Sequence, residues 1–423
     1  MTDLKDILLD YGRRARQAAR ALARLTTEQK NAALLAMAAQ IEARSHEIIK
    51  ANLADLESNT TGLTNAMMER LTLNQRRVHA MADGVRQVVS LADPVGEVIK
   101  SWTQPNGLRI SKVRVPIGVI GIIYESRPNV TSDAAVLCTK TGNATILRGG
   151  SEAIHSNMAI AEALQAGAAE AGLPADSVLL IPRTDREAVK LMAEMDKFID
   201  LIVPRGGHAL IETVVANARM PVIKHYHGVC ITYVDKDADL DMAVDVVVNA
   251  KTQRPGVCNA LETLLLHHDI ADAFFAKAAP RLAEKKVDIH GDDAIRESLA
   301  RVQYPHIHAA TEEDWSREYL DYIMAAKSVA SMAQAIEHIE TYGSHHSDCI
   351  VTANEAAAEE FLTAVDSATV YWNASTRFTD GGEFGFGAEI GISTDKLHAR
   401  GPMALEELTT YKYIIRGTGQ IKV

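Results

Sequence analysis

The sequence predicts an α/β fold with two doubly wound parallel-sheet domains, and three observations support this prediction. Short β-branched runs such as "IGVIGIIY" alternate with helical segments such as "SEAIHSNMAIAEALQAGAAEAG", which is the pattern of a parallel sheet with crossover helices. The 423 residues are too many for one ordinary hydrophobic core, so two or three domains are expected. Hydrophobic residues make up 47% and charged residues 23%, as in a globular protein.

The elements follow one another in a clear order along the chain. Residues 4 to about 90 carry apolar side chains at helical spacing. Residues 98–115 predict a hairpin, because two β-rich runs flank Pro105-Asn106-Gly107. Strand-and-helix units then run to "FIDLIVPRGG", and a second α/β section extends from "GVCITYVD" to about residue 378. The glycine-rich "FTDGGEFGFGAEIGIST" predicts an irregular segment. The alternating strand at the C-terminus needs a partner, for which the 98–115 hairpin is suitable.

Charge and composition exclude several classes of protein. A net charge of −11 argues against wholesale nucleic-acid binding, and no apolar run reaches the roughly 20 residues that span a bilayer. The basic N-terminal patch follows Asp3, Asp6 and Asp10, and transit peptides avoid acidic residues. The four cysteines are scattered and form neither a disulfide framework nor a paired zinc motif. We therefore expect free thiols in a cytoplasmic protein that binds neither nucleic acid nor membranes.

Cys258 is the candidate nucleophile among these cysteines. It follows the Pro255-Gly256 break and precedes the apolar run of "CNALETLLLH". A thiolate is favoured by a cation or a helix N-terminus, and the sequence predicts both: Arg254 nearby, and a helix beginning near Asn259. From the residues alone, a structural thiol is an equally good reading. The other three cysteines are more typical of core positions, and the "HHSDC" run (345–349) is a weak zinc candidate without helical spacing, so we expect no metal.

Two glycine turns follow predicted strands and precede predicted helices. They are "LRGGSEA" (147–153) and "VPRGGHALIE" (203–212). Exposed amides at such a place favour anions, although a tight turn is the more common reason for two glycines. Neither stretch matches the G-x-G-x-x-G fingerprint, so a dinucleotide fold of that type is not predicted.

Several motifs together resemble the γ-glutamyl phosphate reductase family of the aldehyde dehydrogenase superfamily. They are "TQRPGVCNALETLLLH", "YESRPNVTSDA", "LRGGSEA", "PRGG" and "DADLD". The resemblance covers essentially the whole chain. It implies an aldehyde dehydrogenase-like fold with three parts: an NADP-binding domain (1–97 and 116–228, with a return segment at about 379–400), a catalytic domain (229–378) carrying Cys258, and a small β oligomerisation flap (98–115 and 401–423).

The resemblance also implies roles for individual residues. Cys258 is the catalytic nucleophile, and Asn129 helps to stabilise the oxyanion. The implied substrate is a polyanion and the chain is net acidic, so local cations are needed, and Arg127 and Arg254, which flank the motif segments, are our candidates. The cofactor-binding residues lie in the two glycine turns and in "GGEFGFG": Arg148, Gly149, Gly150, Ser151, Glu152, Arg205, Gly206, Gly207, Glu383 and Phe384. Arg148 stands where related enzymes carry a lysine, and an arginine suits the 2′-phosphate of NADP.

One departure from the superfamily pattern bears on the direction of reaction. Counting back from "DADLD" (237–241), the general-base glutamate of aldehyde oxidisers falls on His225. An oxidiser needs that base to activate water against a thioester, whereas a reductase must keep water away from it. The missing carboxylate therefore favours the reductive direction.

The resemblance thus implies an NADPH-dependent reductase of L-glutamyl 5-phosphate that acts in proline biosynthesis through a Cys258 thioester. We expect a homo-oligomer that is functionally coupled to glutamate 5-kinase. Because no kinase-like region precedes residue 1, we expect a free-standing enzyme. The alternatives are a cysteine-dependent acyl hydrolase or transferase, which would need no nicotinamide, and a catalytically silent scaffold, in which alkylation of Cys258 would change nothing.

Overall fold

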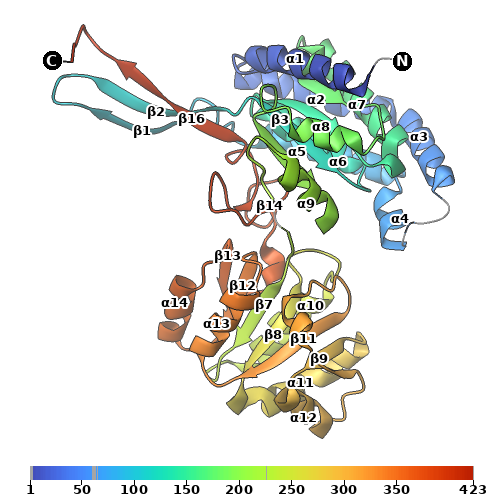
Figure 1. Ribbon diagram of the computed structural model, residues 1–423, viewed down its shortest axis with the longest axis vertical. Helices are drawn as coiled ribbons and strands as arrows, with labels where there is room; N and C mark the ends of the chain where they lie inside the picture. Colours follow the sequence, from blue (N-terminus) through green and yellow to red (C-terminus); the bar gives the residue numbers. More distant parts are fainter. Residues whose placement is uncertain (1–2, 60–62, 64, 225, 423) are drawn as a thin grey trace. The chain divides into compact units, whose positions relative to one another are not determined.

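The chain folds into two compact units (Figure 1), and the computed structural model describes residues 3–59, 63, 65–224 and 226–422. The first unit comprises Met1–Lys224, Gly385–Gly391 and Met403–Val423, and the second comprises His225–Phe384 and Ile392–Pro402. The segment predicted to return to the cofactor domain, at about 379–400, is thus divided between the units. An α/β architecture with parallel sheets confirms the predicted fold class.

The N-terminal part of the first unit is helical, as the spacing of its apolar residues predicted. Its helices are α1 (Leu4–Leu22), α2 (Thr27–Ala43), α3 (Ser45–Ser58), α4 (Asn65–Leu71) and α5 (Gln75–Ser90). A capping box starts α2, where the Thr26 hydroxyl accepts from the Gln29 amide and the Gln29 side chain accepts from the Thr26 amide. Helix α2 packs closely on α7, because a Cβ on Gly167 would lie 2.4 Å from the Met37 nitrogen.

A parallel sheet with strand order β5-β4-β3-β6 forms the centre of the first unit. Its strands are β3 (Val119–Tyr124), β4 (Ala144–Arg148), β5 (Val178–Leu180) and β6 (Leu201–Arg205). The helices between and after them are α6 (Asn129–Lys140), α7 (Ile154–Glu170), α8 (Glu187–Ala193) and α9 (His208–Asn217). The β-branched runs predicted as buried strands are buried along almost their whole length.

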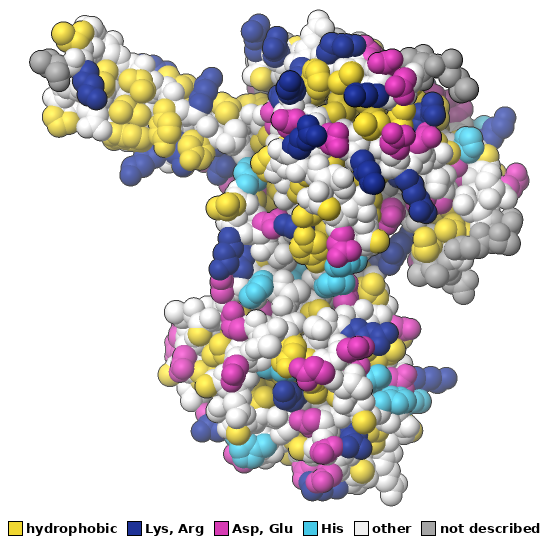
Figure 2. Space-filling view, in the orientation of Figure 1, with side chains coloured by type: hydrophobic (Ala, Val, Ile, Leu, Met, Phe, Trp, Pro, Cys, Tyr) yellow, Lys and Arg dark blue, Asp and Glu magenta, His cyan; other side chains and the backbone are white. Residues whose placement is uncertain are grey.

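An antiparallel ribbon also belongs to the first unit and is formed by β1 (Val98–Thr103), β2 (Arg109–Pro116) and β16 (Thr409–Arg416). The predicted hairpin is confirmed, with Gly107 at a φ of 87° in its turn. The C-terminal strand pairs with β2 from Thr409 opposite Pro116 to Arg416 opposite Arg109. Figure 2 shows hydrophobic side chains gathered on this ribbon.

The second unit is built on a parallel sheet with strand order β10-β9-β11-β8-β7-β12-β13. Its strands are β7 (Cys230–Val234), β8 (Leu261–His267), β9 (Asp288–Gly291), β10 (Ile307–Ala309), β11 (Ile323–Val329), β12 (Ser347–Val351) and β13 (Thr369–Trp372). Its helices are α10 (Leu240–Thr252), α11 (Ala271–Glu284), α12 (Asp293–Arg301), α13 (Met332–Tyr342) and α14 (Glu355–Ala364). Strands β14 (Ile392–Ser393) and β15 (Gly401–Pro402) pair antiparallel. Among the described residues, every helix is too short or too polar to cross a membrane.

Candidate active site

Cys258 lies in a turn between α10 and β8 of the second unit, near the middle of the parallel sheet. It is partly exposed, whereas Cys138, Cys230 and Cys349 are buried, as predicted for core positions. The helix predicted to begin near Asn259 is wrong, because the residues that follow form β8. The apolar run is buried on both sides between β7 and β11, so it forms a central strand. No helix N-terminus formed by this run faces the sulfur.

Asn259 fastens the Cys258 turn to a distant part of the second unit. Its Nδ2 donates to the carbonyls of Thr379 at 2.9 Å and Arg377 at 3.3 Å. In return, the Thr376 hydroxyl donates to the Asn259 carbonyl at 2.8 Å. Asn259 is 5% exposed, so water competes little for these bonds. They hold the 3₁₀ turn η5 (Thr376–Phe378) against the turn that carries Cys258.

The main chain of Cys258 contacts the first residue of β7, Cys230, and the nearby Gly228. The buried Cys230 thiol donates to the Cys258 carbonyl at 3.2 Å. Gly228 passes so close that a Cβ there would lie 2.0 Å from the same carbonyl oxygen. A side chain at position 228 would therefore displace the turn.

A buried ion pair connects the two elements on either side of the Cys258 turn. Lys251 in α10 and Glu262 in β8 have fully buried side chains, with 2.8 Å between Nζ and Oε2. Lys251 also donates to the Leu261 carbonyl at 2.9 Å. Burial raises the pKa of Glu262 and lowers that of Lys251, and each charge opposes the shift of the other. The pair fixes the two ends of the turn to each other, and breaking it would leave a buried charge unpaired.

Two arginines supply positive charge beside Cys258. Arg254 is exposed and lies four residues before Cys258. Arg377 is half-buried, and its Nε donates to Oε1 of Gln253 at 2.9 Å. Burial lowers the pKa of Arg377, the like charge of Arg254 lowers it further, and Cys258 acts in the opposite direction. The sequence reading missed Arg377, although the irregular "STRFTDGGEFGFG" stretch was the signal that could have drawn attention to it.

In the first unit, Arg127 and Asn129 lie where β3 passes into α6. Asn129 is the first residue of α6, and its exposed side chain donates to Oδ2 of Asp133 at 2.8 Å. Burial raises the pKa of Asp133 to about 6, and this hydrogen bond opposes the shift. The Asn129 amide is thus held in one orientation. Arg127 is half-buried beside it.

The first predicted cofactor turn follows β4. Arg148 is 6% exposed, and its guanidinium donates to the carbonyls of Thr184 at 3.1 Å and Asp185 at 3.4 Å. Its Nε has no hydrogen-bond partner among the described residues. The Glu152 carboxylate accepts hydrogen bonds from the amide and hydroxyl of Ser126. Gly149 allows a close approach, since a Cβ there would lie 2.1 Å from Nδ2 of Asn157.

The helices that follow the two glycine turns, α7 and α9, have main-chain amides at their N-termini that already donate hydrogen bonds to carboxylates of the chain. At α7, Asp55 accepts from the amides of His155 at 3.1 Å and Ser156 at 2.8 Å. At α9, the amide of Gly207 donates to Oε2 of Glu125 at 2.9 Å. A Cβ on Gly206 would lie 2.5 Å from the same Glu125 oxygen, so a side chain there would have to displace the carboxylate. An anionic ligand at the α9 turn would compete with Glu125.

Glu383 and Phe384 belong to the second unit, in the glycine-rich turn after η5. Asp380 organises this turn, because its Oδ1 accepts from the amide of Gly382 at 2.8 Å and its carbonyl accepts from that of Phe384 at 2.9 Å. Both predicted side chains are exposed. His225, which the sequence places at the general-base position, lies outside the described residues.

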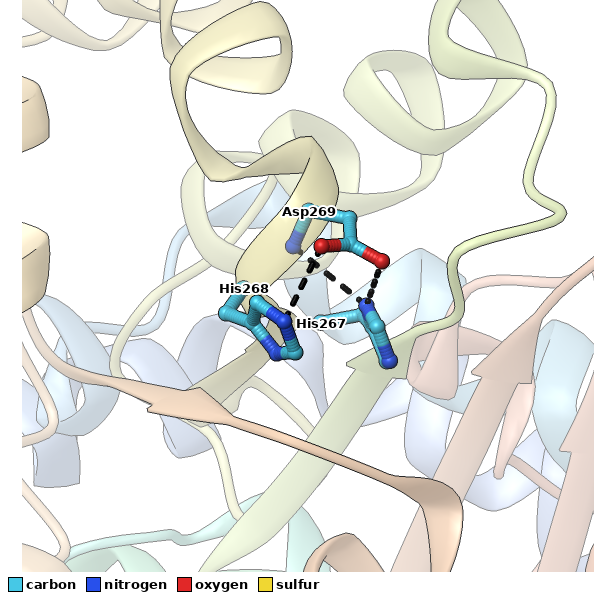
Figure 3. A group of neighbouring side chains, drawn as sticks. All are labelled: His267, His268 and Asp269. Atoms are coloured by element: carbon cyan, nitrogen blue, oxygen red, sulfur yellow. Dashed lines mark hydrogen bonds and ion pairs between the residues drawn. The ribbon is translucent and has the colours of Figure 1, made fainter.

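One group of side chains resembles a metal site but is already hydrogen-bonded. It lies after β8 and comprises His267, His268 and Asp269 (Figure 3). Nδ1 of His267 accepts from the Asp269 amide at 3.4 Å, and Nε2 of His268 lies 2.9 Å from the Asp269 carboxylate. The two rings stack with centroids 4.6 Å apart. These contacts are those of a turn that begins the next helix.

The two parallel-sheet units and the partly exposed thiol of the second unit are those of an α/β enzyme with a candidate cysteine nucleophile. Comparison with known proteins identifies the family. The model of the aldehyde dehydrogenase family matches residues 10–314, and the chain belongs to this family. A γ-glutamyl phosphate reductase of Moorella thermoacetica is 56% identical over 412 residues, which is 97% of both proteins.

Solved structures agree with this assignment. The crystal structure of a γ-glutamyl phosphate reductase from Thermotoga maritima matches with a TM-score of 0.95 and 46% identity, covering 98% of this chain and 100% of that one. An acetylating aldehyde dehydrogenase from Geobacillus thermoglucosidasius matches with a TM-score of 0.70 and 18% identity over 100% of both chains, which shows the shared fold alone.

Proposed function

We propose that this protein reduces L-glutamyl 5-phosphate to L-glutamate 5-semialdehyde and inorganic phosphate, the second step of proline biosynthesis from glutamate. The observation that carries the proposal is the setting of Cys258: the one thiol of four that is not buried, in a turn beside Arg254 and Arg377. The relatives named γ-glutamyl phosphate reductase support the choice of substrate.

In this mechanism the Cys258 thiolate attacks the acyl carbon, the bond to the phosphate oxygen breaks, and phosphate leaves with the electron pair. Amides of the Cys258 turn, with the side chain of Asn129, stabilise the oxyanion that forms during the attack. A nicotinamide cofactor, when bound, supplies the hydride that reduces the thioester. Cys258 then leaves as a thiolate and the aldehyde is released. Arg127 and Arg254 are the proposed contacts for the charged ends of the substrate.

The family uses a nicotinamide cofactor, and we propose that this chain prefers NADPH. The buried guanidinium of Arg148, whose Nε has no partner among the described residues, suits the 2′-phosphate, and the Glu152 carboxylate suits a ribose hydroxyl. Gly149, Gly150 and Ser151 let the main chain approach the ligand. The remaining proposed contacts are Arg205, Gly206 and Gly207 for the pyrophosphate, Glu383 for the nicotinamide ribose, and Phe384 for the nicotinamide ring.

The proposal is tested by replacing Cys258 and measuring NADPH oxidation with L-glutamyl 5-phosphate generated in the assay. Cys258→Ser should reduce turnover below detection while cofactor binding persists, because serine lacks the acidity and nucleophilicity of a thiol. Cys349→Ala removes a buried thiol of the same unit and is the matched control, which should keep substantial activity. Full activity in Cys258→Ser would exclude the covalent mechanism.

The β1-β2-β16 ribbon is the proposed oligomerisation flap. Tyr411, Tyr413 and Ile415 alternate along β16 and are 48%, 54% and 57% exposed. Exposed apolar side chains on one face of a ribbon are typical of a protein interface, and we propose that a second copy of this chain covers them. Deleting residues 412–423 should lower the particle mass measured by light scattering, whereas an unchanged mass in a folded truncation would refute the assignment.

Functional coupling to glutamate 5-kinase is part of the same proposal, because the acyl phosphate that the kinase makes is labile in water. A cytoplasmic location is proposed from the free thiols, which suit a reducing compartment.

A further inference from the structure

Arg377 reaches the Cys258 turn from a distant part of the chain and is fixed there by both its main chain and its side chain. Its carbonyl accepts from Nδ2 of Asn259, the residue after Cys258, at 3.3 Å. Its Nε donates to Gln253, the residue before Arg254, at 2.9 Å. Two arginines therefore lie at the Cys258 turn: Arg254 belongs to the turn itself, and Arg377 belongs to η5.

The positive charge of these two arginines is not balanced by a close carboxylate. Within the described part of the chain, no carboxylate oxygen forms an ion pair within 4.0 Å of Arg254 or Arg377. Asp380, whose charge also acts on Arg377, uses its Oδ1 to accept from the amides of Gly382 and Glu383. Burial first, and the charge of Arg254 second, lower the pKa of Arg377. Placing two like charges together is unfavourable unless an anion joins them.

We propose that Arg377, together with Arg254, holds the phosphoryl group of an acyl phosphate beside Cys258. This assignment rests on the proposed function and names the site of its leaving group. As the Cys258 sulfur bonds to the acyl carbon, the carbon–oxygen bond to phosphate breaks and the phosphate takes the electron pair. A guanidinium fork matches the oxygens of that departing dianion and neutralises the charge that it gains.

The α-carboxylate of the substrate is the competing anion for the same arginines. The position of Arg377 favours the phosphate, because η5 is bonded directly to the residue that follows the nucleophile. The phosphate is attached to the carbon that the sulfur attacks, whereas the α-carboxylate lies at the far end of the substrate. The two ligands make different predictions in the reverse reaction, where phosphate is a separate substrate.

The first test is the KM for inorganic phosphate in the reverse reaction with glutamate 5-semialdehyde and NADP⁺. Arg377→Gln should raise the KM for phosphate by about 10–100-fold, since a hydrogen bond to a charged group contributes about 1.5–3 kcal/mol, and should change the KM for semialdehyde much less. Arg377→Lys should recover part of the loss. Arg301→Gln, which removes an exposed arginine on α12, is the control and should leave both constants unchanged. An unchanged phosphate KM in Arg377→Gln, or a rise confined to the semialdehyde KM, would overturn the assignment.

The second test needs no turnover and distinguishes failure of this site from failure of the proposed function. Because the other cysteines are buried, the rate of iodoacetamide alkylation in the folded protein reports on Cys258. Inorganic phosphate should slow alkylation of the wild type, and Arg377→Gln should need at least about 10-fold more phosphate for the same protection. A protein without reductase activity that still shows this difference would retain the anion site and lose the proposed function. Equal protection of wild type and variant by phosphate would overturn the site, whatever the activity.

Discussion

The candidate anion-binding positions of the two units differ in whether a carboxylate of the chain already neutralises them. In the first unit, amides at the N-termini of α7 and α9 are already bonded to the carboxylates of Asp55 and Glu125. In the second unit, Arg254 and Arg377 lie beside Cys258, and neither forms an ion pair with a described carboxylate. A phosphate that binds at the α9 turn must therefore displace a carboxylate, whereas one that binds beside Cys258 relieves a repulsion. The first arrangement suits a cofactor that is exchanged in every turnover, and the second suits a substrate that must be held while its leaving group gains charge.

Each unit also contains a buried carboxyl group, and the two groups differ in their surroundings. Asp55 of the first unit accepts hydrogen bonds from main-chain amides at the N-terminus of α7, whereas Asp348 of the second unit lies within β12. Burial raises the pKa of Asp348 to about 7, opposed by hydrogen bonds from the Ser367 hydroxyl and the Ile231 amide. The unfolded pKa is near 4, so the folded state keeps the proton to higher pH. Stability from this group is therefore lost as the pH rises from about 4 to 7.

Asp348→Asn should consequently stabilise the folded protein by about 1.5 kcal/mol at pH 5 and by up to about 4 kcal/mol at pH 8, since one pKa unit corresponds to about 1.4 kcal/mol and the unfolded carboxyl is already ionised at pH 5. Denaturant unfolding at the two pH values measures the difference. Asp55→Asn is the matched control and should destabilise at both by about 1–3 kcal/mol, because its carboxylate accepts three hydrogen bonds from His155 and Ser156. An equal loss of stability at pH 5 and pH 8 in Asp348→Asn would show that Asp348 is ionised in the folded protein.

Replacing Arg148 tests whether the first unit nevertheless supplies a cation for the cofactor. If Arg148 holds the 2′-phosphate as proposed, Arg148→Gln should weaken NADP⁺ binding by about 10–100-fold through loss of a hydrogen bond to a charged group, and should leave NAD⁺ binding nearly unchanged. Fluorescence titration with both cofactors gives the two affinities. Arg183→Gln is the control, since Arg183 is more exposed and pairs with Asp185 nearby. Equal weakening of NADP⁺ and NAD⁺ would assign Arg148 a purely structural role.

The sequence predicted most of this architecture, because its signals are local. The β-branched runs, the turn at Gly107 and the helical spacing of residues 4–90 each depend on neighbouring residues, and the structure confirms all three. The strand after Cys258 was misread as a helix, since a short apolar run has the same composition in a buried helix and in a central parallel strand. Arg377 was missed because its contact with the Cys258 turn joins residues far apart in the sequence, which no local pattern records.

The smallest predicted effect concerns the carboxylate that occupies the α9 turn. Glu125→Gln preserves an oxygen that can accept from the Gly207 amide and removes the charge that competes with a phosphate. We expect cofactor affinity to rise by up to about 5-fold, the range for an exposed charge. Calorimetric titration with NADP⁺ at low salt measures the change, and weaker binding in Glu125→Gln would mean that the carboxylate supports the bound state.

The reverse reaction of the wild-type protein, followed with and without inorganic phosphate, tests the central claim most directly. The claim is that phosphate takes part in the chemistry at Cys258 through the cationic pair of the second unit. With glutamate 5-semialdehyde and NADP⁺, the absorbance of the reduced cofactor should increase only when phosphate is present, and the rate should saturate with phosphate concentration. An equal rate without phosphate would mean that water releases the acyl group from Cys258, and this would contradict the acyl-phosphate mechanism.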